Sequence, residues 1–97
     1  MKKVVTLDHR YNGKGYFKYR IEFTKQDRAM EYIDCLHWSV ETWGMSCSLN
    51  LFLDTDELVA KGTPDWVWEE DHSTSFRKLR IYLKGDQELT LFKLKWG

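Results

Sequence analysis

Two short motifs carry residue types that enzymes use. Asp71-His72-Ser73 places the three residue types of a hydrolase triad in succession, and Gly13-Lys14-Gly15 contains part of a phosphate-binding loop. Catalytic triads assemble from distant segments, because the side chains of adjacent residues point in different directions. The Gly-Lys-Gly segment lacks the rest of the GxxxxGK[ST] pattern and precedes a strand pattern instead of a helix. We therefore predict a protein that is not an enzyme, with no catalytic residues.

Metal ligands are also poorly spaced. Cys35 and His37 are two positions apart in a predicted helix, so their side chains point in different directions, and Cys47 does not complete the set. Asp54 and Asp56 have the first spacing of a calcium loop, but the glycine and the bidentate glutamate of that loop are missing. We expect no metal site, no cofactor and two reduced cysteines.

Length and composition favour one folded domain. The 97 residues are 42% hydrophobic and 31% charged, which is typical of a globular chain, and residues 1–97 suffice for a single core. The apolar runs are far shorter than the roughly 20 residues that span a bilayer. Met1-Lys2-Lys3 leads into a strand pattern instead of the apolar core of a signal peptide. We therefore expect a cytoplasmic protein that does not contact a membrane.

Charge is sorted along the chain although the net charge is zero. Residues 1–25 carry seven Lys or Arg against two Asp or Glu, a net charge of +5. Residues 26–75 carry two against eleven, a net charge of −9, and residues 76–97 carry six against two, a net charge of +4. If the two basic ends meet in space, they form a cationic surface beside an anionic one, which bears on association with partners.

The first half of the chain predicts a hairpin and then a helix. Val4, Val5 and Leu7 indicate a strand, residues 9–15 a turn, and residues 16–23 a second strand. In that second strand one face is apolar, formed by Phe17, Tyr19, Ile21 and Phe23. An amphipathic helix then ends before Gly44, with a 3,4-spaced apolar stripe of Ala29, Ile33, Leu36, Val40 and Trp43.

The second half predicts one strand, a crossing loop and two further strands. Residues 47–53 alternate as in a half-buried strand, and residues 54–62 predict a crossing loop with one helical turn. Trp66 and Trp68 indicate a strand at the edge of the sheet that runs into an acidic, polar loop. In the next strand we expect one inward face, formed by Leu79, Ile81 and Leu83.

Residues 86–96 fit two kinds of secondary structure, a strand or a helix. Gly85-Asp86 is a suitable hairpin turn, after which the apolar residues fit a strand. Alternatively, Asp86 caps a helix in which Leu89, Phe92 and Trp96 keep a 3,4 spacing. We favour the helix because it repeats the strand-helix order of the first half.

Two strand-helix halves predict an α+β fold. The arrangement is similar to the ferredoxin-like split βαβ sandwich, an antiparallel sheet with helices packed on one face and the other face open. Residues 81–97, a strand, an acidic cap and then Leu-Phe-Lys-Leu-Lys-Trp-Gly, resemble the ends of small uncharacterised proteins of tailed bacteriophages. This resemblance implies the cytoplasm of an infected bacterium, and it implies no catalytic residues.

We expect the protein to act by binding. An acidic edge that bears tryptophan is a reasonable anchor for a protein partner, because tryptophan is enriched at interface hot spots. The predicted anchor residues are Trp66, Trp68, Glu69 and Glu70. The identity of the partner and the oligomeric state, including a homodimer, stay open, as does which tryptophans are exposed.

The alternative hypothesis is an RNA or single-stranded nucleic-acid binder. If the strands at 16–23 and 76–84 are neighbours, their outward faces place two aromatic rings among five cations, a layout similar to that of RNA-recognition-motif domains. The residues are Tyr16, Lys18, Arg20, Lys78, Arg80, Tyr82 and Lys84. The Gly-Phe-rich octapeptide of that family is missing from both strands.

Overall fold

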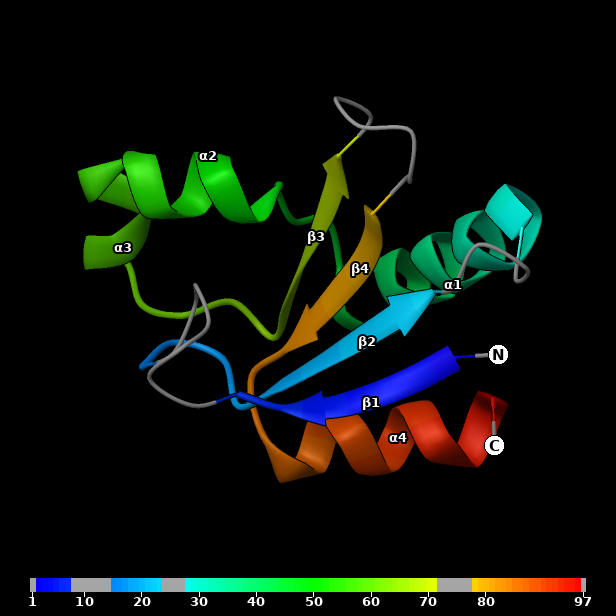
Figure 1. Cartoon of the computed structure of the whole chain (residues 1–97). Coiled ribbons are helices and arrows are strands. Elements are labelled where there is room, and N and C mark those ends of the chain that lie inside the picture. The colour runs from blue at the N-terminus through cyan, green and yellow to red at the C-terminus, as the bar shows by residue number, and fades with distance from the viewer. Residues whose placement is uncertain (1, 8–14, 24–27, 72–77, 97) are drawn as a thin grey trace.

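Four strands of alternating residues pair into one antiparallel sheet. The computed structural model describes residues 2–7, 15–23, 28–71 and 78–96 (Figure 1). The chain order is β1 (Lys2–Thr6), β2 (Tyr19–Phe23), α1 (Arg28–Trp43), α2 (Leu49–Asp54), α3 (Asp56–Ala60), β3 (Trp66–Asp71), β4 (Lys78–Leu83) and α4 (Asp86–Trp96). The sheet order is β1-β2-β4-β3, so β2 and β4 are the central strands. The predicted α+β fold, the hairpin of the first two strands and the edge position of β3 are confirmed.

The connection from β2 to β3 forms a split βαβ unit. β2 and β3 are both antiparallel to β4, which lies between them, so β2 and β3 run in the same direction. β1 pairs with the free side of β2, from Lys2 opposite Phe23 to Thr6 opposite Tyr19. In the ferredoxin-like sandwich that edge position belongs to the last strand in the chain. The topology is compatible with this sandwich, with the edge strand supplied by the beginning of the sequence instead.

The main core lies between the sheet and helices α1 and α4. On the sheet side it contains Ile21 and Phe23 of β2, Leu79, Ile81 and Leu83 of β4, and Trp66 of β3. Tyr32 and Cys35 of α1 and Leu89 and Phe92 of α4 pack against them. The inward face predicted for β4 is therefore confirmed. Apolar and polar residues alternate in the central strands, and apolar residues have a 3,4 spacing in α4, so these apolar side chains lie in one layer.

The opposite face of the sheet is covered as well, which corrects the prediction of an open face. Leu49 and Phe52 of α2 bury themselves against Phe17, Val67 and Tyr82 in a second, smaller core. Figure 1 shows α2 and α3 on the other side of the sheet from α1. An open face would leave the side chains of Val67 and Tyr82 exposed to water, and in the structure both are buried in the second core.

Helix α2 replaces a predicted strand, so the strand predicted at residues 47–53 is wrong. Ser48 is its N-cap, and the Ser48 hydroxyl accepts a hydrogen bond from the Leu51 amide at 3.2 Å. Leu49 and Phe52, three residues apart, are buried, whereas Leu51 is exposed. The burial follows a helical period, while the sequence letters alternate with a period of two. The helical turn predicted within 54–62 is confirmed as α3, with Gly62 beyond its end at φ +105°.

Helices α1 and α4 are confirmed, with one difference in the buried side of α1. Tyr32, Cys35 and Ser39 are buried there, whereas Ile33 of the predicted stripe is exposed. Ser39 tolerates burial because its hydroxyl donates a hydrogen bond to the Cys35 carbonyl at 2.8 Å. In α4, Leu89 and Phe92 are buried and Trp96 is half-buried, as the 3,4 spacing predicted. Asp86 is the first residue of this helix, one position later than a cap.

Strand β2 begins three residues later than predicted. The chain bends at Lys18. The backbone amide of Lys18 donates hydrogen bonds to the carbonyls of Leu83 and Lys84 at 3.1 and 3.2 Å. Because of this bend, Phe17 packs in the second core and not on the Ile21 side. Among the described residues, no helix is long and apolar enough to cross a membrane.

Candidate functional site

The predicted tryptophan anchor is largely part of the fold. Trp66 is 1% exposed, belongs to the main core, and donates its indole Nε1–H to the Gly44 carbonyl at 3.0 Å. Trp68 is half-buried, packs against the same core and lies 5.4 Å from Trp66 between ring centroids. The prediction that Trp66 contacts a partner is therefore wrong. A small core needs bulky side chains, and an indole with a satisfied N–H supplies them.

The two glutamates of the predicted anchor differ from each other. Glu69 is half-buried, and its Oε1 accepts hydrogen bonds from Arg80 Nη1 at 3.0 Å and from the Tyr82 hydroxyl at 2.9 Å. Glu70 is exposed on the main-core face beside Tyr32, where its charge adds to the effect of burial in raising the pKa of the Tyr32 hydroxyl. Glu69 thus belongs to a hydrogen-bond network within the protein, and Glu70 is the most accessible of the four predicted anchor residues.

The predicted nucleic-acid face is a closed network of ion pairs. Arg20 Nη2 lies 2.6 Å from Glu22 Oε1, and Arg80 lies 3.0 Å from Glu69 Oε1 and 3.6 Å from Glu22 Oε1. The strand register brings these residues together, because Glu22 pairs with Arg80 and Glu69 pairs with Arg80 across the sheet. Two arginines face two glutamates, so the network has no net charge to attract phosphate.

The aromatic rings of that face do not form a stacking platform. Tyr82 is 1% exposed, and burial raises the pKa of its hydroxyl. A base stacks on an exposed ring, so the assignment of Tyr82 to stacking is wrong. Tyr16 is partly exposed, but it packs edge-on against Phe52 with centroids 5.3 Å apart. Lys84 is exposed, and Lys78 is described by its backbone alone.

Lys18, the remaining cation of the predicted set, joins the sheet to the start of α4. Its Nζ donates to Asp86 Oδ1 and Oδ2 at 3.0 and 3.1 Å, and the Tyr19 hydroxyl donates to Asp86 Oδ1 at 2.5 Å. These hydrogen bonds, the one from Tyr19 foremost, lower the pKa of the Asp86 carboxyl, and the bond to Asp86 raises the pKa of the Lys18 ammonium. A carboxylate in the first turn also complements the helix dipole.

The outer side of α4 is apolar and exposed. Leu94 is 79% exposed, and Leu91, one turn before it, is 40% exposed. Both leucines lie on the opposite side of the helix from Leu89 and Phe92, which are in the core. We call this region the α4 outer surface and define it by Gln87, Thr90, Leu91, Leu94 and Lys95, all of which are exposed.

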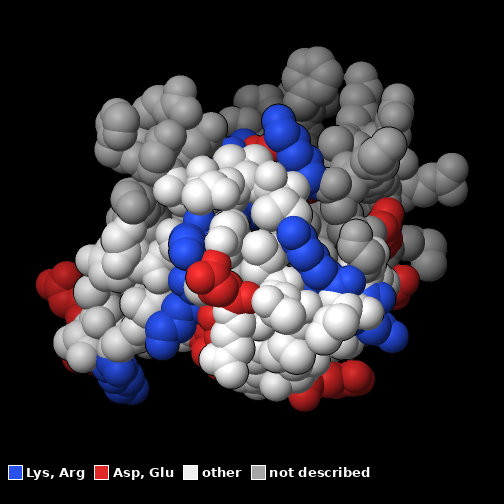
Figure 2. Space-filling model, turned by 90° about the horizontal axis from the view of Figure 1, so that it is seen from below, with Lys and Arg blue, Asp and Glu red and all other residues white. Residues whose placement is uncertain are grey.

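Basic side chains border this surface. Figure 2 looks at the molecule from below, where α4 lies in Figure 1, and shows mostly uncharged atoms in the middle, with Lys and Arg on both sides and some Asp or Glu among them. Lys93 and Lys95 are the basic residues of the last turn of α4, and Lys95 Nζ lies 5.6 Å from the centre of the Trp96 ring. The surface thus combines exposed leucines with positive charge.

The sequence contained a signal for this surface. Residues 86–96 hold five large apolar residues, but the stripe of Leu89, Phe92 and Trp96 uses three of them. Once the helix is chosen over the strand, the remaining leucines point away from the core. Their exposure depends on what else packs on α4, which a sequence pattern does not reveal.

Comparisons with protein-family models, with curated proteins and with solved structures gave no match to this chain. Within the described ranges, no group of three His, Cys, Asp or Glu residues is placed to hold a metal ion. Of the Asp71-His72-Ser73 motif, His72 and Ser73 lie outside those ranges, and Asp71 is described by its backbone alone. The α4 outer surface is therefore the candidate site with the clearest basis in the described geometry.

Proposed function

We propose that this protein is a binding domain that docks on another protein through the α4 outer surface. The observation that carries the proposal is the exposure of Leu94 and Leu91 one helical turn apart, on a helix whose other side is in the core. Single exposed apolar residues are common, but a row along one helix is the pattern that helix-in-groove recognition uses. Burying both side chains in a partner would remove this apolar area from water.

The chemistry of the surface favours an acidic, apolar groove on the partner. Lys95 is exposed beside the leucines, and Lys93 lies in the same turn. Charge complementarity would raise the association rate and orient the helix in the groove. The phage-like pattern of residues 81–97 adds the proposal of an accessory protein that docks on a host or viral protein in a bacterium.

The test is capture from bacterial lysate by the immobilised protein, with and without nuclease. Leu94→Glu places a charge on the proposed surface, where burial in a partner would be costly. Leu51→Glu is the matched control, because Leu51 is 53% exposed on α2, on the opposite face of the sheet. We expect Leu94→Glu to weaken capture of a specific protein at least about tenfold, which corresponds to about 1.4 kcal/mol, and Leu51→Glu to leave it unchanged.

Two outcomes would contradict the proposal. Equal capture by both variants would show that the exposed leucines of α4 do not form the interface. Loss of capture after nuclease treatment would favour nucleic acid as the partner. Circular-dichroism melts of both variants check that the folded state is retained.

A further inference from the structure

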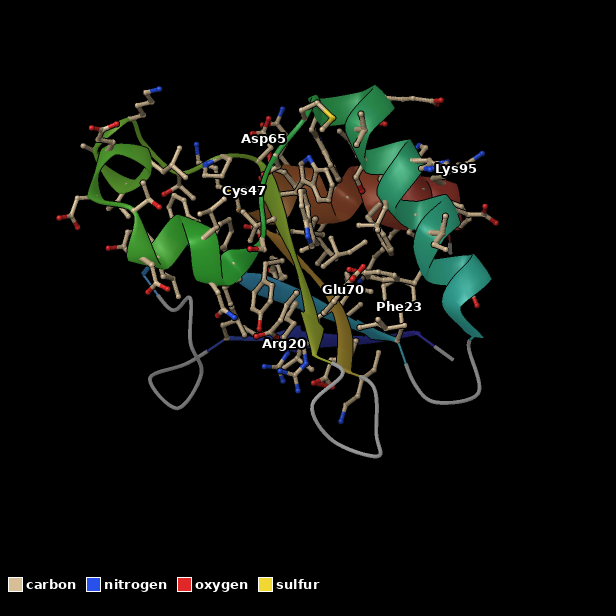
Figure 3. All side chains as sticks on the ribbon, turned by 90° about the horizontal axis from the view of Figure 1, so that it is seen from above. Arg20, Phe23, Cys47, Asp65, Glu70 and Lys95 are labelled. Atoms are coloured by element: carbon tan, nitrogen blue, oxygen red, sulfur yellow. The ribbon has the colours of Figure 1, made fainter. Side chains whose placement is uncertain are left out.

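A pocket lies on the α2 side of the sheet, away from the α4 outer surface. Its volume is about 310 Å³, and the described residues that line it are Met45, Ser46, Cys47, Phe52, Leu58, Lys61, Gly62 and Pro64. Figure 3 shows Cys47 on the segment that runs from α1 to α2, across from the segment that carries Asp65. Two connections and two short helices therefore form its walls.

Local contacts hold the Cys47 wall in place. The Cys47 carbonyl accepts a hydrogen bond from the Trp68 amide at 3.3 Å, and Ser48 forms a parallel bridge with Trp68. The Ser46 hydroxyl donates to the Trp66 carbonyl. The wall is thus attached to the outer edge of β3. A pocket with such a wall exists before a ligand arrives, so binding does not need to order this segment.

The lining is apolar at the bottom and basic at the opening. Phe52 is buried, and Leu58 and Pro64 are half-buried, whereas Lys61 is exposed. Among the described lining residues Lys61 is the only charged one. Met45 is 80% exposed beside the opening, and methionine adapts its shape to a ligand better than branched residues do.

We propose that this pocket binds a small amphiphilic carboxylate, with its hydrocarbon part against Phe52 and Leu58 and its carboxylate beside Lys61. The volume is at the lower end of the range of about 300–1,000 Å³ for ligand sites, which favours a molecule of roughly ten non-hydrogen atoms. Apolar contact supplies most of the affinity, and the exposed ammonium contributes a smaller, salt-sensitive part.

Cys47 provides a reporter inside the pocket. It is half-buried, and burial raises the pKa of its thiol, so it reacts slowly but measurably with a disulfide reagent. The probe is octanoate, and the measurement is the rate of thiol modification in the folded protein. Cys35 is fully buried, and Cys47→Ser gives the background rate. We expect about tenfold slower modification when octanoate is at about ten times its dissociation constant.

Two comparisons separate the charge from the hydrocarbon. Lys61→Gln should weaken protection by octanoate between about 1.5- and 5-fold, the range of an exposed ion pair, and leave protection by octanol unchanged. Lys93→Gln is the matched control on α4 and should change neither. Leu58→Trp fills the pocket and should abolish protection by both probes, with a thermal melt to confirm folding.

Absence of protection by octanoate in the wild-type protein would overturn the proposal. Equal loss of octanoate and octanol protection in Lys61→Gln would overturn the assignment of the carboxylate. Protection that persists in the folded Leu58→Trp protein would place the probe elsewhere. None of these outcomes bears on capture through the α4 outer surface, because the two sites lie on opposite faces of the sheet.

Discussion

At the scale of single residues, the charged side chains of the sheet act as structural partners. Figure 3 shows Arg20 and Phe23 of β2 on opposite sides of the sheet, with Phe23 toward α1. The Arg20 side chain is nearly buried, and the Arg80 guanidinium lies beside both Glu22 and Glu69. Removing one member of such a network leaves an uncompensated charge, which costs more than the pair itself contributes. These ion pairs therefore connect adjacent strands of the sheet.

The Asp86 carboxylate predicts a pH dependence of stability. Its pKa is lowered from the ordinary 3.8, mainly by the Tyr19 hydrogen bond, so the ionised form stabilises the folded state. This contribution is complete above the unfolded-state pKa and is lost as pH falls through the folded-state pKa. We expect Asp86→Asn to melt at a lower temperature than wild type near neutral pH, with the difference vanishing in acid.

Thermal melts across the acidic range measure this difference. Tyr19→Phe removes the largest stabilising hydrogen bond of the carboxylate and should reduce the pH dependence without abolishing it, because Lys18 remains. A melting-temperature difference between wild type and Asp86→Asn that stays constant with pH would contradict the assignment.

At the scale of elements, α2 shows how packing decides between helix and strand. Cys47, Leu49, Leu51 and Leu53 alternate as in a strand, yet the segment is a helix of six residues. A short apolar run fits both periods, and the choice depends on the surface that it covers. Here Val67 and Tyr82 form an apolar patch on the second face of the sheet, and a helix brings Leu49 and Phe52 onto it together.

The Ser48 cap gives a test of this element. Ser48→Ala removes the acceptor for the Leu51 amide and should lower the free energy of unfolding by about 0.5–2 kcal/mol, the usual loss for an N-cap. Ser48→Asp keeps an acceptor and should stay within a few tenths of a kcal/mol of wild type. Urea denaturation measures both. A larger loss with Asp than with Ala would indicate a strand instead of a capped helix.

At the scale of the whole molecule, two cores of unequal size share one sheet. The central strand β4 contributes to both cores, with Ile81 in the main core and Tyr82 in the second core, whereas α3 has no buried residue. Stability should follow this distribution, because local opening is easiest where few apolar contacts are lost. The second core is therefore expected to open before the main core.

Amide hydrogen exchange measures this order directly. We expect the amides of Ile21 and Ile81 to exchange through global unfolding, and those of Leu58 and Val59 in α3 to be at least about a hundredfold less protected, a difference of about 2.7 kcal/mol. Equal protection of α3 and the central strands would show that both cores unfold as one unit.

Most of the secondary structure could be predicted from the pattern of apolar and polar residues. Alternation in β4 and the 3,4 spacing in α4 predicted these elements, because in each case one side of the segment is consistently apolar. The fold class followed from the order of strands and helices. Turn residues, such as Gly44 after α1, marked where segments end.

Which apolar and charged residues remain accessible depends on how the helices and strands pack together. Trp66 and Tyr82 looked available because each lies on a face that the pattern assigned to solvent or to an edge, but neighbouring elements bury them. Leu94 is exposed because α4 uses its opposite side for the core. The period and spacing of apolar residues are local properties of the chain. The burial of a side chain depends on segments far away in the sequence, so packing determines which residues are exposed and where the candidate site lies.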